Sequence, residues 1–493
     1  MKARKINIDD GLREMIPVII FCLALAVIFC IPLRVMAYGY LPPDDAMRHA
    51  GKVIAEKSWD KILVLRPEFK MDSHPGWHAI LGLVRAVSGC NQDALVFFSV
   101  IGLFTLFCLI PIFFLEFPEA WLASLLAVIV LAPHLIIRLF LGRPFIFTMS
   151  VILILCFLWP RLKEKKPPYA IMGILAGLIA CSTWIHASWY LFVLPIASFF
   201  IAREWRAGIR LMLCAAAGII IGASFTGHPY LFLKQTFTHM MLAFGNVSAQ
   251  RLLVGEFQSF GGEAFIVLFI LGILVWRKSR GKWDAGIVYN PVFVLAVCGW
   301  VFGFVATRFW TDWGMPAAIF WIMSELNNLF AEKAQTASSK RLIIAFAITG
   351  ALFLAITPDT NSRWTYNLTT EYLTQDNKKQ AEWLPEPGGI IYSDDMRLFY
   401  QTFFKNPKAP WRYILGFEPA MMPPEDLAVL RKIHWNFAAG EAFKPWVEKM
   451  RPEDRLVIRG AYNAKPPVAG LEWHYAATGT WIGRLPRNNS GKY

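Results

Sequence analysis

Long apolar blocks recur along this chain and limit what it can fold into. Each block is about 16–24 residues long, which is the length of an α-helix that crosses a bilayer. Hydrophobic residues make up 56% of the 493 residues, whereas soluble domains contain about 45–50%. Because a backbone in lipid must satisfy its own hydrogen bonds, such blocks fold as helices. The sequence therefore predicts a mainly α, polytopic membrane protein.

We expect about eleven transmembrane helices. Their predicted ranges are 15–37, 93–115, 119–138, 145–160, 169–185, 187–202, 211–226, 263–276, 290–307, 313–331 and 342–357.

The distribution of positive charge predicts how these helices are oriented. Lys and Arg cluster in the connections 161–168, 203–210, 277–283 and 332–341, and short basic loops stay in the cytoplasm. The net charge of +14 therefore indicates basic cytoplasmic loops. A nucleic-acid partner is not indicated, because the sequence has no basic stripe interleaved with aromatic residues. We expect a protein of the plasma (inner) membrane whose N-terminus lies in the cytoplasm.

Two domains follow from this topology. Residues 1–357 form the transmembrane domain, with a first external loop at 38–92, and residues 358–493 form a soluble extracytoplasmic domain. In the second domain we expect an α/β fold, with strands at 389–392, 456–458 and 480–482 and a helix at 425–433.

The first candidate site is the acidic pair Asp44-Asp45, which follows the first apolar block and Pro43. Carboxylates at the mouth of a membrane helix are costly, so they indicate a possible function. One of them can act as a general base while the other orients a substrate or a neighbour such as Arg48. The alternative is a helix cap, in which the acid accepts hydrogen bonds from the first turn.

Candidate cations lie on the same predicted side of the membrane. A row of positive groups suits an anionic ligand such as a lipid phosphate, although interfacial snorkelling of Arg and a simple Pro-Gly turn around the histidines are alternatives. These substrate- or phosphate-binding candidates are Arg48, His49, His74, Arg138, Arg143, His186 and Arg308.

The order of these motifs resembles that of the GT-C glycosyltransferases, in the branch of protein O-mannosyltransferases and lipid A aminoarabinose transferases. That branch has an acidic pair after the first span, as in Asp44-Asp45, then a His-Pro-Pro or Lys-Pro-Pro turn, which His74-Pro75-Gly76 resembles. Gly142-Arg143-Pro144 resembles an Arg-bearing stretch before the fourth span, but the acid that often follows it is absent. His186 stands near the position of a family lysine. The similarity in motif order covers roughly residues 15–200.

The resemblance implies a polyprenyl-phosphate-sugar-dependent glycosyltransferase. It implies inverting transfer, in which a carboxylate deprotonates the acceptor hydroxyl, the oxygen attacks the anomeric carbon and cations stabilise the leaving phosphate. The implied partners are a polyprenyl-phosphate sugar donor, membrane lipids and a lipid, glycan or protein acceptor. No cofactor is certain, and a divalent metal is possible, although Asp44 and Asp45 alone are too few ligands to define its site.

Two other functions are compatible with the sequence. A transporter or flippase of a lipid-linked saccharide would have repeated halves and ionisable residues at mid-membrane depth, and the sequence shows neither. A non-catalytic assembly subunit would tolerate loss of the acidic pair.

Overall fold

The structure is a computed structural model that describes residues 8–42, 44–244, 258–333, 339–460 and 465–486. By its internal contacts the chain divides into two compact units. We call the first the helical unit, which comprises Met1–Tyr40, Phe97–Ser224 and Ser259–Thr365, and the second the α/β unit, which comprises Leu41–Val96, Phe225–Gln258 and Tyr366–Tyr493.

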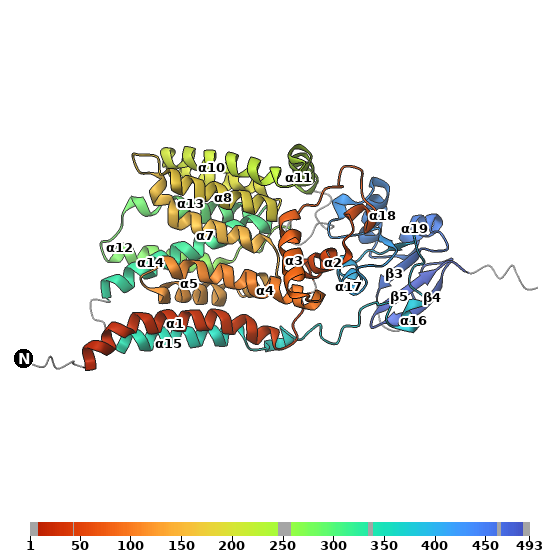
Figure 1. Ribbon diagram of the computed structural model, residues 1–493, viewed down its shortest axis with the longest axis horizontal. Helices are drawn as coiled ribbons and strands as arrows, with labels where there is room; N and C mark the ends of the chain where they lie inside the picture. Colours follow the sequence, from red (N-terminus) through yellow and green to blue (C-terminus); the bar gives the residue numbers. More distant parts are fainter. Residues whose placement is uncertain (1–7, 43, 245–257, 334–338, 461–464, 487–493) are drawn as a thin grey trace, which may run out of the picture. The chain divides into compact units, whose positions relative to one another are not determined.

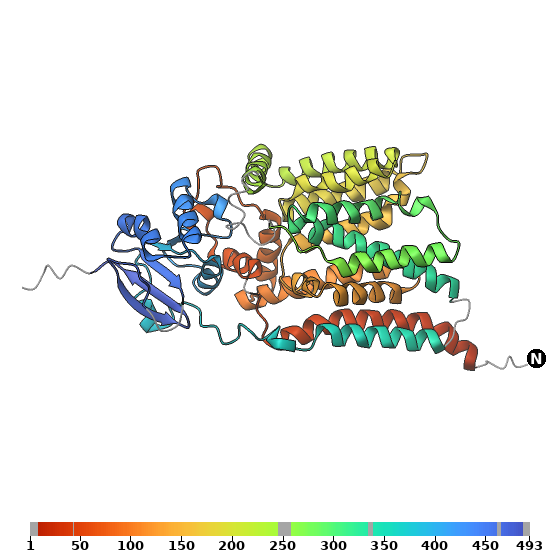
Figure 2. The ribbon, with the colours of Figure 1, turned by 180° about the vertical axis from the view of Figure 1, so that it is seen from behind.

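The helical unit is a bundle of long helices, drawn side by side in Figures 1 and 2. Its N-terminal helix α1 lies against α15, and α8 packs along α10. The helices are α1 (Ile8–Met36), α4 (Gln92–Leu109), α5 (Pro118–Leu131), α6 (His134–Leu139), α7 (Phe145–Leu162), α8 (Tyr169–Ile185), α9 (Val193–Ile201), α10 (Trp205–Ser224), α12 (Ala264–Ser279), α13 (Pro291–Gly303), α14 (Met315–Lys333) and α15 (Ser339–Ile356), with a π-helix η7 (Phe309–Gly314) before α14.

A helix lies at each of the predicted spans, which confirms a mainly α protein of membrane type. Among the residues that the structure describes, four helices are long and apolar enough to cross a membrane, and the count of eleven spans stays a prediction. These four are Met15–Met36, Gln92–Phe114, Phe145–Leu162 and Trp205–Ser224.

One predicted span, 119–138, is not continuous. Helix α5 ends at Leu131, and a separate short helix α6 begins at His134. The break falls at Pro133, whose nitrogen has no hydrogen to donate to the preceding turn. The consequence is that Arg138 lies on its own short helix.

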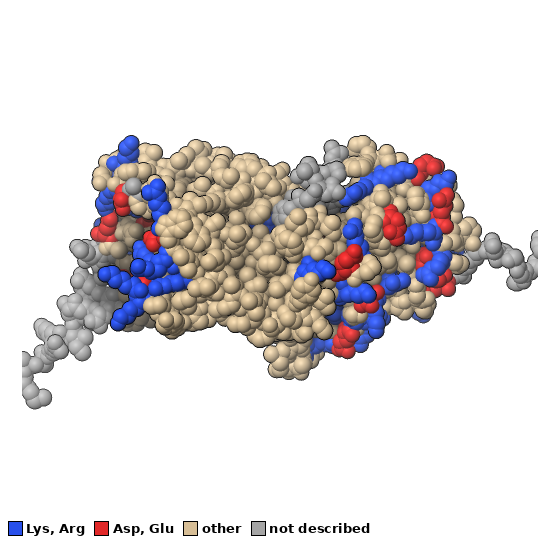
Figure 3. All heavy atoms as spheres, turned by 90° about the horizontal axis from the view of Figure 1, so that it is seen from above, with Lys and Arg blue, Asp and Glu red and all other residues tan. Residues whose placement is uncertain are grey.

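Basic connections meet at one end of the helical unit. Arg210 donates from Nη1 to the carbonyl oxygen of Glu164 (2.7 Å), and Lys163 pairs with Glu204 (3.6 Å). Arg277 pairs with Glu325 of α14 (2.6 Å). Figure 3 shows Lys and Arg gathered at this end of the bundle and a wide belt of uncharged surface beside it. Two connections predicted to share the cytoplasmic side, 161–168 and 203–210, therefore do lie together, while their orientation in a membrane stays a prediction.

The α/β unit contains a mixed five-stranded sheet with strand order β2-β1-β3-β5-β4. Strand β1 pairs in parallel with β2 and β3, and β5 pairs antiparallel with β3 and β4. The predicted strands and helix are confirmed, whereas β2 and β4 were not predicted. The elements of residues 366–493 are α16 (Lys378–Ala381), β1 (Ile390–Tyr392), α17 (Met396–Lys405), β2 (Arg412–Tyr413), α18 (Pro424–Trp435), α19 (Lys444–Lys449), β3 (Arg455–Arg459), β4 (Glu472–Ala477) and β5 (Thr480–Arg484).

The first loop is part of this same unit. It forms α2 (Asp45–Ala55), a 3₁₀ turn η1 (Trp59–Lys61) and α3 (Pro75–Ser88). Trp59 shares a hydrophobic core with Phe417, and their ring centroids lie 5.0 Å apart. The unit also includes α11 (Pro229–Phe244), a helix where the sequence suggested only a loop. The predicted domain boundary at residue 357 stays a prediction.

The topology yields a labelling prediction. In a background without the native cysteines, Lys432→Cys should react with a membrane-impermeant maleimide in intact cells, because α18 lies in the segment expected outside. Lys165→Cys, in a basic connection, should react only after lysis. Both side chains are exposed, so accessibility does not bias the comparison, and the reverse labelling pattern would refute the topology.

Candidate functional site

Asp44 begins helix α2. Its side-chain Oδ1 accepts a hydrogen bond from the backbone N–H of Asp45 (2.6 Å), and its backbone is extended. The structure therefore places Asp44 at the N-cap, as the helix-cap alternative requires. A carboxylate at the cap projects from the end of the helix instead of from its side, and this position remains compatible with a role as a base. Pro43 lies outside the described residues.

Asp45 is held by Arg48, three residues further along α2. Arg48 Nε donates to Asp45 Oδ1 (2.9 Å), which is the contact expected from the sequence. The guanidinium also stacks on the ring of Phe417, with its central carbon 3.9 Å from the ring centroid. Arg48 is only 2% exposed, so the pair is shielded from solvent and fixed in orientation.

A chain of hydrogen bonds leads from Arg48 to a second carboxylate. Arg48 Nη2 lies 3.3 Å from His49 Nε2, His49 Nδ1 lies 2.8 Å from His78 Nε2, and His78 Nδ1 lies 2.5 Å from Asp72 Oδ2. A guanidinium only donates, so His49 Nε2 must accept and His49 Nδ1 must carry the proton. His78 Nε2 then accepts, and His78 Nδ1–H donates to Asp72. The geometry thus indicates that both rings are neutral and carry their proton on Nδ1.

Asp72 anchors this chain. Burial raises the pKa of its carboxyl, but the hydrogen bonds from His78 and from the backbone of His74, together with the charge of Lys52, oppose that effect, and the pKa lies well below its usual range. Its Oδ1 also accepts from the backbone N–H of His74 (3.0 Å). The ionised carboxylate therefore fixes the start of α3 relative to α2.

The role of His74 in phosphate binding stays a prediction, and the surroundings of its imidazole bear on the charge it carries. Burial, followed by the nearby charge of Arg48, holds the pKa of this imidazole well below its usual value of 6.5. A ring that is neutral at pH 7 offers no positive charge to a phosphate. Similarly, His49 is 0% exposed, and its contacts indicate that it positions Arg48.

The other predicted cations come together inside the helical unit, around one buried carboxylate. Arg138 donates to Asp312 Oδ1 from Nη2 (2.5 Å), and Arg308 Nε donates to Asp312 Oδ2 (3.1 Å). His186 Nε2 lies 2.8 Å from Arg308 Nη2. Asp312 is 2% exposed, and the three partners are each less than 10% exposed. Residues from three segments of the chain, around Arg138, around His186 and at 308–312, thus form one cluster.

Arg143 adds a third guanidinium to this cluster. It is 7% exposed, and its charge acts on that of Arg138. Three guanidinium groups therefore lie in one buried cluster of an apolar bundle. Guanidinium groups bind carboxylate and phosphate in a bidentate way, so the cluster suits an anionic ligand such as a phosphate.

The structure brings together Asp44, Asp45, Arg48, His49 and His74 in the α/β unit, and Arg138, Arg143, His186 and Arg308 in the helical unit.

Three partners were not among the predicted site residues. Asp312 had a signal, since it follows Arg308 by four residues on one helical face. For Asp72 and His78, the only signal in the sequence was their position in or next to a polar turn. His78 reaches His49 only because α3 packs against α2, and Asp72 joins the chain through His78.

Metal binding has no support from a ligand cluster. In the part of the chain that the structure describes, no group of three or more His, Cys, Asp and Glu side chains is arranged to hold a metal ion. A divalent metal therefore stays a prediction from the family resemblance alone.

Comparison with known proteins identifies the fold. No protein-family model matches the chain, and no curated protein matches it. The crystal structure of ArnT from Cupriavidus metallidurans bound to undecaprenyl phosphate aligns over 97% of this chain and 99% of that one, with a TM-score of 0.53 and 11% identity. The apo structure of the same protein aligns over 94% of this chain and 97% of that one, with a TM-score of 0.48 and 13% identity. The alignment with the undecaprenyl phosphate-bound structure shows that the chain has the fold of ArnT, and the predicted resemblance is confirmed at the level of fold.

The buried imidazole of His74 predicts a loss of stability in acid. An unfolded histidine binds its proton near pH 6.5, whereas folded His74 binds it only at lower pH, so the unfolded state takes up more protons between these values. Stability should thus fall as the pH drops below about 6.5, by up to about 1.4 kcal/mol per pH unit.

Thermal unfolding at pH 7.5 and 5.5 measures this effect. His74→Gln should show a smaller decrease in melting temperature than the wild type, because it has no proton to bind. His228→Gln, which changes an exposed histidine, is the control and should behave as the wild type. Equal decreases in all three proteins would show that His74 titrates normally.

Proposed function

We propose that this protein is a membrane glycosyltransferase that moves a sugar from a polyprenyl-phosphate-linked donor to an acceptor hydroxyl outside the cytoplasm. The observation that carries the proposal is the buried cluster of Arg138, Arg143 and Arg308, in which Asp312 bonds two of the three guanidinium groups. Three guanidinium groups held close together suit the oxygen atoms of a phosphate. The fold is shared with a protein solved with undecaprenyl phosphate, which supports a polyprenyl phosphate as the molecule that supplies the anion.

Asp44 is the proposed general base. It takes the proton from the acceptor hydroxyl while that oxygen forms a bond to the anomeric carbon of the sugar. At the same time, the bond between the anomeric carbon and the phosphate oxygen breaks. Both electrons of that bond stay on the oxygen, which leaves as part of the polyprenyl phosphate. Attack opposite to the leaving group inverts the configuration.

The arginine cluster is the proposed binding site for the departing phosphate. Negative charge develops on the leaving oxygen, and guanidinium groups held in place by Asp312 and His186 stabilise it without first having to reorient. Because the cluster lies in an apolar bundle, its charges are less screened than they would be in water.

Asp45 is the proposed positioning carboxylate. Arg48 fixes it, and the chain of His49, His78 and Asp72 fixes Arg48 in turn. This arrangement holds the first turn of α2 in one geometry, so that Asp44 at its cap faces the acceptor in a constant position.

Replacing Asp44 tests the base. Asp44→Asn keeps the size of the side chain and its ability to cap α2, but it does not accept a proton. Turnover should fall by about 10²–10⁴-fold, measured as release of polyprenyl phosphate from a polyprenyl-phosphate sugar in the presence of acceptor. Expression and donor binding should stay at wild-type levels.

Asp45→Asn is the matched variant and should lower turnover less, because its role is orientation. Wild-type turnover in Asp44→Asn would leave Asp44 as a helix cap only. In that case transport of a lipid-linked saccharide would become the better explanation of the fold.

Replacing Arg143 tests the phosphate site. Arg138 and Arg308 also bond Asp312, so their loss would disturb the bundle, and Arg143 is the cleaner choice. Arg143→Ala should weaken binding of a polyprenyl phosphate by about tenfold or more, as expected for a lost charged hydrogen bond. Arg161→Ala, at an exposed basic connection, is the control. Equal affinities of the two variants would exclude Arg143 from the site.

A further inference from the structure

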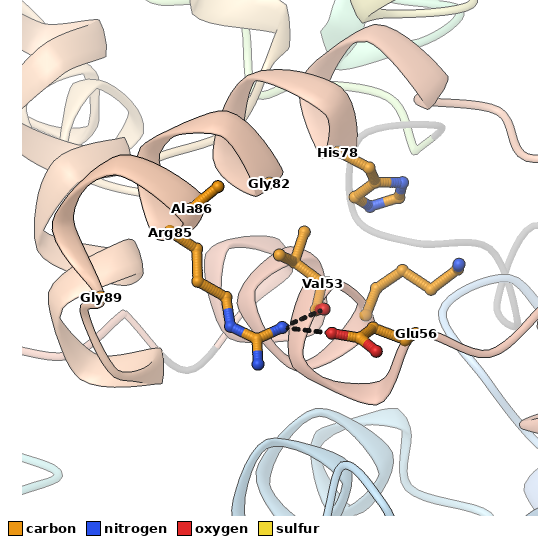
Figure 4. Close-up of a pocket in the computed structure, with 8 residues that line it drawn as sticks. Val53, Glu56, His78, Gly82, Arg85, Ala86 and Gly89 are labelled. Atoms are coloured by element: carbon orange, nitrogen blue, oxygen red, sulfur yellow. Dashed lines mark hydrogen bonds and ion pairs between the residues drawn. The ribbon is translucent and has the colours of Figure 1, made fainter.

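A cavity of about 640 Å³ lies between α2 and α3 in the α/β unit. Figure 4 shows His78, Gly82, Ala86 and Gly89 on the α3 side and Val53 and Glu56 on the α2 side. The proposed transfer reaction does not use this cavity. Its volume is within the usual range for sites that hold a small molecule or a headgroup.

Small residues on α3 create the space. Gly82 and Ala86 are one helical turn apart, and Gly89 follows at the C-cap. A Cβ atom at Gly82 or Gly89 would have no heavy atom within 4 Å. The wall is thus open at these positions, and a larger side chain at Gly82 would project into the cavity without displacing other atoms.

The cavity is lined by two cations and one carboxylate. Arg85 bridges the helices by donating from Nη1 to the carbonyl oxygen of Val53 (3.2 Å) and to Glu56 (2.7 Å). Within the described residues, the ammonium of Lys52 makes no hydrogen bond or direct ion pair, and it lies 5.5 Å from the ring centroid of Trp59. Burial lowers the pKa of Lys52, with the charge of Asp72 opposing that effect. The ammonium therefore interacts with Asp72 at a distance and has no carboxylate in direct contact.

The outer face of α3 is apolar and exposed. Leu83 is 65% exposed and Val87 is 81% exposed, and the two are one turn apart on the same helix that lines the cavity. An amphipathic helix with such a face lies in the membrane interface, with its apolar side among acyl chains. Apolar exposure beside a cation that has no direct ion pair within the described residues fits a lipid with an anionic headgroup better than a soluble anion.

We propose that this cavity binds the phosphate of an anionic glycerophospholipid, with Lys52 as the main contact and an acyl chain along Leu83 and Val87. The lipid is a bound component of the protein and not the sugar donor or acceptor. It holds the first loop at the membrane surface, because one ligand contacts both α2 and α3.

Lipid binding to the full-length protein in a nonionic detergent tests the proposal. The probes are phosphatidylglycerol, phosphatidylcholine with the same acyl chains, glycerol 1-phosphate and a polyprenyl phosphate, each followed by native mass spectrometry and by thermal stabilisation. Phosphatidylglycerol should bind and stabilise the wild type, and the other three should neither match its affinity nor displace it.

Two variants and two matched controls locate the site. Lys52→Met should weaken phosphatidylglycerol binding by about fivefold, the effect of one basic residue near an anionic headgroup, and Gly82→Leu should abolish it by filling the cavity. Lys405→Met changes a half-buried lysine over aromatic rings, and Gly102→Leu changes a helical glycine with open surroundings. Both controls should bind as the wild type.

Four results would overturn the proposal. Unchanged affinity in Lys52→Met and Gly82→Leu would place the lipid elsewhere. Equal binding of phosphatidylcholine would show that the protein does not distinguish a net-negative headgroup from a neutral one. Equal binding of glycerol 1-phosphate would show that the ligand of the cavity is a soluble anion and not a lipid. Displacement by polyprenyl phosphate would make the cavity part of the donor site. None of these results depends on sugar transfer, so the proposed reaction is tested separately.

Discussion

The candidate site in the helical unit depends on the ion pairs that the buried carboxylate of Asp312 makes with two arginines. An ionised group inside an apolar bundle is unfavourable unless it is paired and hydrogen-bonded. Asp312 meets this requirement with Arg138 and Arg308, and His186 extends the pairing. The bundle is irregular where these residues lie: Pro133 interrupts the helix before Arg138, a π-helix carries Asp312, and His186 follows the end of α8. The irregular backbone therefore positions the polar groups.

The same principle operates in the α/β unit, with hydrogen-bonded imidazoles in place of guanidinium pairs. The chain from Asp45 to Asp72 links the start of α2 to the start of α3, and each ring has one donor and one acceptor nitrogen committed. Any protonation of His49 or His78 would replace an acceptor with a second donor and break the chain. A fixed arrangement of neutral rings and ionised carboxylates therefore requires that solvent be kept away, which agrees with the burial of Arg48 and His49.

Hydrophobic periodicity and length were sufficient to predict the helices, because a membrane leaves a backbone few alternatives. The sidedness of Arg138, His186 and Arg308 was also predictable, since it follows from where helices end. The break at Pro133 and helix α11 were missed, because apolar composition does not report where a helix stops or starts. Asp72 and His78 were missed for another reason: they bond each other across a turn, and only the packing of α3 against α2 brings His78 to His49.

In the proposed reaction, the charge of the arginine cluster suits a leaving group better than a bound donor. Arg138, Arg143 and Arg308 bring three guanidinium groups to this cluster. A phosphate that joins a sugar to a polyprenyl chain is a diester with one negative charge, whereas the released monoester approaches two. We therefore expect the cluster to attract the phosphate more strongly as the bond to the sugar breaks. Interactions that strengthen between the ground state and the transition state are the ones that accelerate a reaction.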